Sequence, residues 1–316
     1  SKMVKTAFLF PGQGSQSPGM MSVLANEFSI VRETFDSASA VLGYDLWSVV
    51  KDNPENTLNS TEVTQPAMLV SGIASWRVWR HLGGARPDYF AGHSLGEYTA
   101  LVASGVIEFT DAVAIVAARG RLMQQLTPLG TGSMVAVYGL DDELLRGICG
   151  QVENGEIVAC SNYNAPGHVV ISGHCEAVDL ATGLALEAGA RRIQPLPVSV
   201  PCHCLLMKPA AIQLQTELLS VHFSDSSIPV IQNADVRAYH DAEQVREALA
   251  RQLWQPVRWT ETIASLLDSG VTHFAECGPG NKLAELNRQI SQKAAVVSLT
   301  GKDIMNEFIK LEEGNE

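Results

Sequence analysis

The segment Ala91-Gly92-His93-Ser94-Leu95-Gly96-Glu97-Tyr98 contains the pattern G-x-S-x-G and decides the predicted fold. The residues from Asp88 to His93 can form a strand, and those from Leu95 to Ala103 have the composition of a helix. A serine at a sharp turn between a strand and a helix is typical of a nucleophile elbow. The alternative is a structural serine at the start of a helix. The pattern therefore predicts that Ser94 is an exposed nucleophile in an α/β fold.

Similar strand-turn-helix segments occur before and after this one. Apolar runs at Thr6 to Phe10, Tyr89 to His93 and Thr272 to Glu276 are each followed by a glycine-bearing turn and a helical pattern. This alternation predicts an α/β layer, like that of the α/β-hydrolases, with a mainly parallel sheet.

The pattern changes between Gly132 and Pro197. The elements predicted there are strands at Met134 to Tyr138, Ile157 to Asn162, His168 to Ser172 and Arg191 to Leu196, with one helix opened by Asp141 and another from Glu176 to Ala188. The order β-α-β-β-α-β predicts an inserted ferredoxin-like unit. We expect a catalytic subdomain of residues 1–130 and 198–316 and a small subdomain of residues 131–197.

The composition excludes several classes of protein. Hydrophobic residues make up 46% of the 316 residues and charged residues 18%, which is the profile of a globular protein. A net charge of -12 repels phosphate backbones and anionic membranes, so neither nucleic acid nor a membrane is an expected partner. The apolar runs are far shorter than the roughly 20 residues of a membrane span, and no signal peptide is evident. We expect a cytoplasmic protein with reduced cysteines.

A serine nucleophile needs a positioned base, and His203 is the candidate among eight histidines. The extended segment Leu196 to Pro201 ends at a proline shortly before it. A hydrogen-bonded histidine at the start of a loop is the alternative. Cys202 and Cys204 flank His203 and could suggest zinc, but the other possible ligands are too scattered for a four-ligand site, so we expect no metal.

Helical phase singles out Arg119. If Thr110 caps a helix, Arg119 lies on its apolar stripe and Arg121 points away from it. The apolar positions of this stripe are Ala112, Ile115, Val116, Leu122 and Met123. A guanidinium on a buried face needs an anion, which is either an internal carboxylate or a substrate carboxylate bound in bidentate fashion.

The turn Pro11-Gly12-Gln13-Gly14-Ser15-Gln16 follows the first predicted strand. It lacks the P-loop lysine and the Rossmann glycine spacing, so it does not predict a phosphate site. A backbone N–H from such a loop can serve as a second oxyanion donor, although a plain tight turn is the alternative. The similar turn Cys277-Gly278-Pro279-Gly280-Asn281-Lys282 indicates no chemistry of its own.

Six ordered segments together are more specific than any one of them. They are Phe10-Pro11-Gly12-Gln13-Gly14-Ser15-Gln16, Ala91-Gly92-His93-Ser94-Leu95-Gly96-Glu97-Tyr98, Arg119-Gly120-Arg121, Pro201-Cys202-His203, Gln252-Leu253-Trp254-Gln255-Pro256-Val257 and Glu276-Cys277-Gly278-Pro279-Gly280. They resemble the ordered motifs of the malonyl-CoA:acyl carrier protein transacylases, and the resemblance spans nearly the whole chain.

The resemblance implies roles for individual residues. Ser94 would be the nucleophile, His203 its base and Arg119 the clamp for the malonyl carboxylate. The backbone N–H groups of Gln13 and Leu95 would form the oxyanion hole. A backbone carbonyl near the Gln252 motif would orient the histidine, so no aspartate would be needed. We further assign Gln252 and Met123 to the substrate-binding residues.

Two positions depart from the family pattern. Cys202 stands where the family usually has serine, and a segment similar to Asn-Ser-Pro-Gly-Gln reads Asn164-Ala165-Pro166-Gly167-His168. Neither change removes a catalytic group, and both concern details of the thioester pocket.

The resemblance implies an acyltransferase of fatty-acid biosynthesis. It would move malonyl from malonyl-CoA to the phosphopantetheine thiol of acyl carrier protein through a malonyl-serine, with ping-pong kinetics and no cofactor besides the coenzyme A thioester substrate. One rival is an α/β-hydrolase-like esterase or thioesterase with the chain order Ser, Asp, His. The aspartates available to it are Asp111, Asp141, Asp142 and Asp179. Another rival is a carrier-protein-binding scaffold without activity, against which an intact Ser94 and His203 argue.

Overall fold

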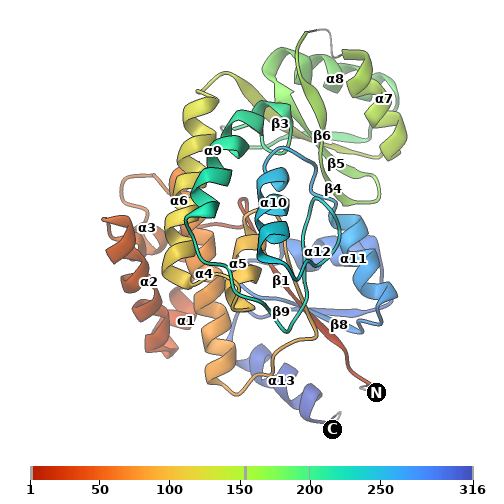
Figure 1. The fold of residues 1–316 in the computed structure, drawn as a ribbon. Helices are drawn as coiled ribbons and strands as arrows, with labels where there is room; N and C mark the ends of the chain where they lie inside the picture. Colours follow the sequence, from red (N-terminus) through yellow and green to blue (C-terminus); the bar gives the residue numbers. More distant parts are fainter. Residues whose placement is uncertain (1–2, 153–154, 199, 315–316) are drawn as a thin grey trace.

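The computed structural model describes residues 3–152, 155–198 and 200–314. Within this part of the chain, one parallel sheet and one antiparallel sheet form two adjoining units (Figure 1). The predicted fold class is therefore confirmed. No helix in the described ranges is long and apolar enough to cross a membrane.

The larger unit is built on a five-stranded parallel sheet with the order β7-β2-β1-β8-β9. Its strands are β1 (Thr6–Phe10), β2 (Tyr89–Gly92), β7 (Val230–Ile231), β8 (His273–Glu276) and β9 (Ala295–Ser298). All five residues of the central strand β1 are buried, as expected for a strand covered on both faces. The last residues of β1 and β2, Phe10 and Gly92, are register partners, so the loops that follow them leave the same edge of the sheet.

Helices cover both faces of the parallel sheet. The helices of this unit are α1 (Ser22–Glu27), α2 (Ser29–Leu42), α3 (Leu46–Lys51), α4 (Thr61–His81), α5 (Gly96–Ala103), α6 (Phe109–Leu126), α9 (Lys208–Leu219), α10 (Ala242–Gln252), α11 (Trp259–Asp268), α12 (Lys282–Ile290) and α13 (Lys302–Glu313). Of these, α2 and α9 pack on other helices. Side chains alternate along β1, so Phe8 packs with Trp79 of α4, while Leu9 on the opposite face belongs to the apolar cluster that includes Ile263 of α11. The two apolar layers hold the sheet edge in place.

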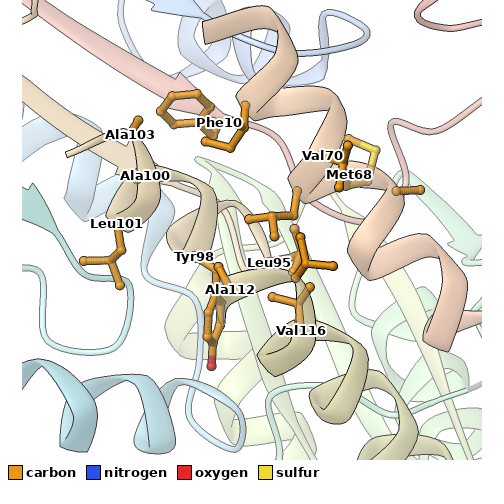
Figure 2. Close-up of a cluster of buried hydrophobic side chains, with 14 of the residues drawn as sticks. Phe10, Met68, Val70, Leu95, Tyr98, Ala100, Leu101, Ala103, Ala112 and Val116 are labelled. Carbon is orange, nitrogen blue, oxygen red and sulfur yellow. The ribbon is translucent and has the colours of Figure 1, made fainter. Parts of the chain in front are cut away.

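The helix after the G-x-S-x-G turn is buried between two longer helices. Figure 2 shows Leu95 and Tyr98 in one apolar cluster with Val70 of α4 and with Ala112 and Val116 of α6. All of these side chains are at most 1% exposed. Apolar packing on this scale holds α5, and with it the turn that precedes it, in a fixed position.

The smaller unit is a four-stranded antiparallel sheet with the order β4-β5-β3-β6. Its elements in chain order are β3 (Gly132–Tyr138), α7 (Asp142–Val152), β4 (Val158–Ala165), β5 (His168–His174), α8 (Cys175–Glu187) and β6 (Arg192–Pro195). This is the predicted ferredoxin-like order, and it lies at the top of Figure 1. The unit has its own apolar core, in which Val137 and Ile171 of the sheet pack against Val178 of α8.

The sequence prediction was wrong in some local details. Thr110 is not a cap, because α6 begins at Phe109 and the extended residue Glu108 is its N-cap. Strands β7 (Val230–Ile231) and β9 (Ala295–Ser298) were not predicted. Both are short and lie at the edges of the sheet, so the sheet itself provides the pairing that their composition does not indicate.

Candidate active site

The G-x-S-x-G segment forms a sharp turn between β2 and α5. Ser94 is in the left-handed region with φ of 54°, which is uncommon for a residue with a side chain. A Cβ atom on Gly92 would lie 1.9 Å from the Gly96 carbonyl oxygen, and one on Gly96 would lie 2.0 Å from that of Phe10. The turn therefore requires both glycines, and it presents a partly exposed Ser94 at the sheet edge.

His203 is hydrogen-bonded to the serine. Its Nε2 lies 2.8 Å from Ser94 Oγ, and its Nδ1 lies 2.7 Å from the Gln252 carbonyl oxygen. A carbonyl oxygen only accepts hydrogen bonds, so Nδ1 carries the proton and Nε2 accepts a hydrogen bond from the serine hydroxyl. The backbone N–H of His203 also donates to the Leu253 carbonyl oxygen at 3.1 Å. A backbone carbonyl therefore occupies the place where the rival esterase needs one of its four candidate aspartates.

Burial determines the protonation state of His203. The ring is almost fully buried, and desolvation together with the nearby Arg119 charge lowers its pKa to about 3. The histidine is therefore neutral near pH 7 and available to accept a proton from Ser94.

Arg119 is buried on α6, as its helical phase predicted. Its side chain is 2% exposed, and it donates to Gln65 Oε1 at 2.7 Å and to Gln252 Oε1 at 2.9 Å. Its Nε has no hydrogen-bond partner, and within the described ranges no salt bridge includes this guanidinium. The nearby Glu97 carboxylate interacts with it electrostatically but accepts its hydrogen bonds from other groups. The positive charge is thus held by two neutral amides.

Gln252, the last residue of α10, connects all three of these groups. Its carbonyl accepts from His203, its side-chain oxygen accepts from Arg119, and its Nε2 donates to the Ser94 carbonyl at 2.7 Å. Met123, one turn along α6 from Arg119, accepts through its sulfur from Gln65 Nε2 at 3.3 Å. Met123 therefore supports the amide that holds Arg119.

The backbone N–H groups of Gln13 and Leu95 are the two candidate oxyanion donors. A Cβ atom on Gly12 would lie 3.4 Å from the Leu95 nitrogen, so the loop after β1 closely approaches the elbow. Among the described residues, no acceptor is found for the N–H of Gln13 or for that of Leu95. Gln13 is further held by a 3.3 Å hydrogen bond from Thr61 to its side-chain oxygen. An oxyanion hole requires unpaired N–H groups beside the nucleophile, so this role stays a prediction for Gln13 and Leu95.

The two departures from the family pattern lie in different surroundings. Cys202 is buried next to His203, and burial raises the pKa of its thiol to about 12, so it is un-ionised. His168 packs against Tyr138 in the small sheet, with ring centroids 4.5 Å apart. Asn164 contacts the elbow instead, because its Oδ1 lies 2.7 Å from His93 Nε2.

Sequence reasoning missed two residues of this network. Gln65 on α4 holds Arg119, and Asn233, after β7, accepts a hydrogen bond from the Ser94 N–H at 2.8 Å. Gln65 and Asn233 lie 54 and 139 residues from the groups that they contact. No local pattern marks either of them, and only an unusual buried polar position on a helix could have indicated Gln65.

Known proteins resemble the chain over nearly its full length. Residues 7–309 match the family model described as "Acyl transferase domain". A protein of Salmonella typhimurium named malonyl CoA-acyl carrier protein transacylase is 50% identical over 288 residues, which are 91% of this chain and 93% of that protein. The protein of the same name from Escherichia coli K12 is 46% identical over 98% of this chain and 100% of its own.

Solved structures agree with these relatives. The malonyl CoA-acyl carrier protein transacylase of Coxiella burnetii has a TM-score of 0.96 and is 43% identical, with 98% of each chain covered. A malonyl-transacylase solved in complex with its type II PKS acyl-carrier protein has a TM-score of 0.95 and is 46% identical, covering 97% of this chain and 99% of that one. The chain therefore belongs to the acyl transferase family, among the malonyl-CoA:acyl carrier protein transacylases.

Proposed function

We propose that the chain transfers a malonyl group from malonyl-CoA to the phosphopantetheine thiol of acyl carrier protein, through a malonyl ester of Ser94. The observation that carries this proposal is the buried Arg119 guanidinium, which neutral amides hold in the same hydrogen-bond network as Ser94 and His203. Glu97 is the nearby carboxylate, but in the described part of the chain it forms no salt bridge with this cation. A buried guanidinium that no protein carboxylate contacts directly suits a substrate that brings its own carboxylate.

The first half-reaction acylates the serine. His203 Nε2 takes the Ser94 Oγ proton as the oxygen attacks the thioester carbonyl, and the N–H groups of Gln13 and Leu95 stabilise the resulting oxyanion. Collapse of the tetrahedral intermediate breaks the carbon–sulfur bond. The departing coenzyme A thiolate receives the proton from His203, and malonyl-Ser94 remains.

The second half-reaction reverses these roles. The phosphopantetheine thiol gives its proton to His203, the thiolate attacks the serine ester, and Ser94 Oγ leaves and is reprotonated by His203. The Gln252 carbonyl accepts from Nδ1 throughout and stabilises the imidazolium in both steps. The chemistry requires no metal or redox cofactor, and ping-pong kinetics follow from the covalent intermediate.

A place in fatty-acid biosynthesis and a cytoplasmic location are parts of the same proposal. None of the six cysteines, all of which the structure describes, forms a disulfide, and thiol side chains and thiol substrates suit a reducing compartment. The rival esterase has no use for a buried guanidinium beside its nucleophile, whereas a malonyl-specific transferase does.

The test is intact-mass analysis of the protein after incubation with malonyl-CoA. The proposal expects a single malonyl adduct on Ser94, which is lost when holo acyl carrier protein is added and is absent from the Ser94→Ala variant. An adduct that water removes as fast as the carrier protein does would support the esterase instead.

A further inference from the structure

The side-chain amide of Asn233 binds the backbone on both sides of the catalytic turn. Its Nδ2 donates to the Gly92 carbonyl at 2.7 Å, and its Oδ1 accepts from the Ser94 N–H at 2.8 Å. Asn233 is fully buried and lies in the loop after β7. The Asn233 side chain, which is distant in sequence, therefore links the backbone before Ser94 to the backbone of Ser94 itself, where φ is positive and the backbone is strained.

The same amide also reaches the residue that orients the base. Gln252 Nε2 lies 3.3 Å from Asn233 Oδ1 and 2.7 Å from the Ser94 carbonyl oxygen. The Gln252 backbone carbonyl accepts from His203 Nδ1. Asn233 therefore contacts both the backbone of the nucleophile Ser94 and the residue that orients the base His203.

Asn233 is itself held by α5. Its backbone N–H donates to Glu97 Oε1 at 2.6 Å, and Gln232 Nε2 donates to Glu97 Oε2 at 3.1 Å. Glu97 is fully buried in the first turn of α5, and burial raises its pKa to about 7. Arg251 forms an ion pair with Asp235, and this contact connects the end of α10 to the loop that contains Asn233.

We propose that Asn233 is a positioning residue, anchored by Glu97, which keeps the Ser94 turn and Gln252 in register so that Ser94 Oγ stays within hydrogen-bond reach of His203 Nε2. This inference rests on the proposed function for its acyl-transfer readout. A serine in the left-handed backbone region is strained, so its backbone shifts toward a more favourable conformation when the hydrogen bonds that hold it are removed. A displacement of the nucleophile by about 1 Å lowers the rate of the chemical step by about 100-fold.

The first test compares Asn233→Ala with a matched control. Asn287 on α12 is also buried, at 4% exposure, and its side-chain oxygen has no hydrogen-bond partner, so Asn287→Ala controls for the loss of a buried asparagine. Rapid-quench mass measurement gives the rate of malonyl-Ser94 formation. We expect Asn233→Ala to lower this rate by about 100-fold with little change in KM for malonyl-CoA, and Asn287→Ala to leave it near the wild-type value.

A second variant, Asn233→Asp, tests the hydrogen-bond pattern and covers the case in which the alanine variant does not fold. A neutral carboxyl group can donate to Gly92 and accept from Ser94 as the amide does, whereas an ionised one cannot donate. The acylation rate of Asn233→Asp relative to wild type should therefore rise as pH is lowered from 8 to 6. The pKa of His203 is lowered to about 3 and that of Asp235 is also lowered, so neither group titrates between pH 8 and 6. Glu97, with a pKa of about 7, titrates in both proteins, and the Arg119 cation is common to both. The ratio therefore reports the substituted residue together with its coupling to Glu97.

Labelling of Ser94 by a fluorophosphonate separates this inference from the proposed function. The probe needs the nucleophile and its base but no malonyl group, so wild type that is labelled but not malonylated refutes the proposed function alone. Asn233→Ala should be labelled far more slowly than Asn287→Ala. Equal labelling of these two folded variants, or a pH-independent ratio for Asn233→Asp, overturns the positioning role.

Discussion

Replacing Arg119 by alanine should separate malonyl transfer from acetyl transfer. The guanidinium is 2% exposed and donates to the side-chain oxygens of Gln65 and Gln252, while its Nε has no hydrogen-bond partner. A malonyl carboxylate would bind this charge directly, whereas an acetyl group leaves the buried charge without a directly bonded anion. Arg119→Ala removes the attraction between the guanidinium and the malonyl carboxylate, and it also removes the cost of leaving the charge unpaired when acetyl is bound.

The expected magnitude follows from the burial of the charge. Breaking a buried, hydrogen-bonded charge pair is worth about 3–5 kcal/mol, which corresponds to about two to four decades in rate. Malonyl transfer by Arg119→Ala should fall by that factor, while acetyl transfer stays unchanged or rises. Because Gln252 Oε1 also loses its donor in this variant, the acetyl rate reports any disturbance of Ser94 and His203, and the ratio of the two rates isolates the carboxylate contact.

The assay measures kcat/KM for malonyl-CoA and acetyl-CoA with one holo acyl carrier protein as acceptor. Arg119→Lys serves as a second variant, since it keeps the charge and loses the planar bidentate geometry. It should recover only part of the malonyl preference. A fall by the same factor for both acyl groups would refute the clamp and make Arg119 a purely structural cation.

The remaining predictions concern the nucleophile, the turn and pH. His203→Ala should lower acylation by about 10⁴-fold or more in the rapid-quench assay, because an unassisted serine hydroxyl is a weak nucleophile. Gly96→Ala should lower the melting temperature strongly or prevent folding, since its Cβ would lie 2.0 Å from the Phe10 carbonyl oxygen. Burial raises the pKa of Glu276 from 4.5 to about 7, so its contribution to stability is present below pH 4.5 and is lost as pH rises through 7. Glu276→Gln should therefore reduce the loss of stability between pH 5 and 8, by at most roughly 3 kcal/mol in urea unfolding; an unchanged pH dependence would contradict the assignment.

Local sequence patterns were sufficient to find Ser94 and Arg119, which lie just after a strand and within a helix, respectively. Ser94 follows a strand and precedes a helix, and Arg119 shares the helical phase of an apolar stripe, so each is visible within about 15 residues of sequence. The ferredoxin-like order of the small sheet was equally local, because each of its strands and helices has its own periodicity.

The residues that hold these groups in place could not be found in that way. Asn233 follows a strand of two residues, and its partner Ser94 lies 139 positions away. Gln65 lies in a helix that is buried on nearly all sides, so no polar stripe marks it as special. Contacts of this kind arise only when the sheet order brings β7 next to β2, and the short edge strand carries too little composition signal to predict that pairing.

The neutral group behind His203 is consistent with a cationic clamp in the same site. Gln252 orients the histidine through its backbone oxygen and reaches Arg119 at 2.9 Å through its side chain. A carboxylate that oriented the histidine at this place would lie close to the guanidinium and would pair with it, which would remove the charge that a malonyl carboxylate needs. A carbonyl keeps the same tautomer of His203 without adding a negative charge. An acyltransferase that selects an acidic acyl group by a buried arginine therefore has a physical reason to orient its base with a backbone carbonyl.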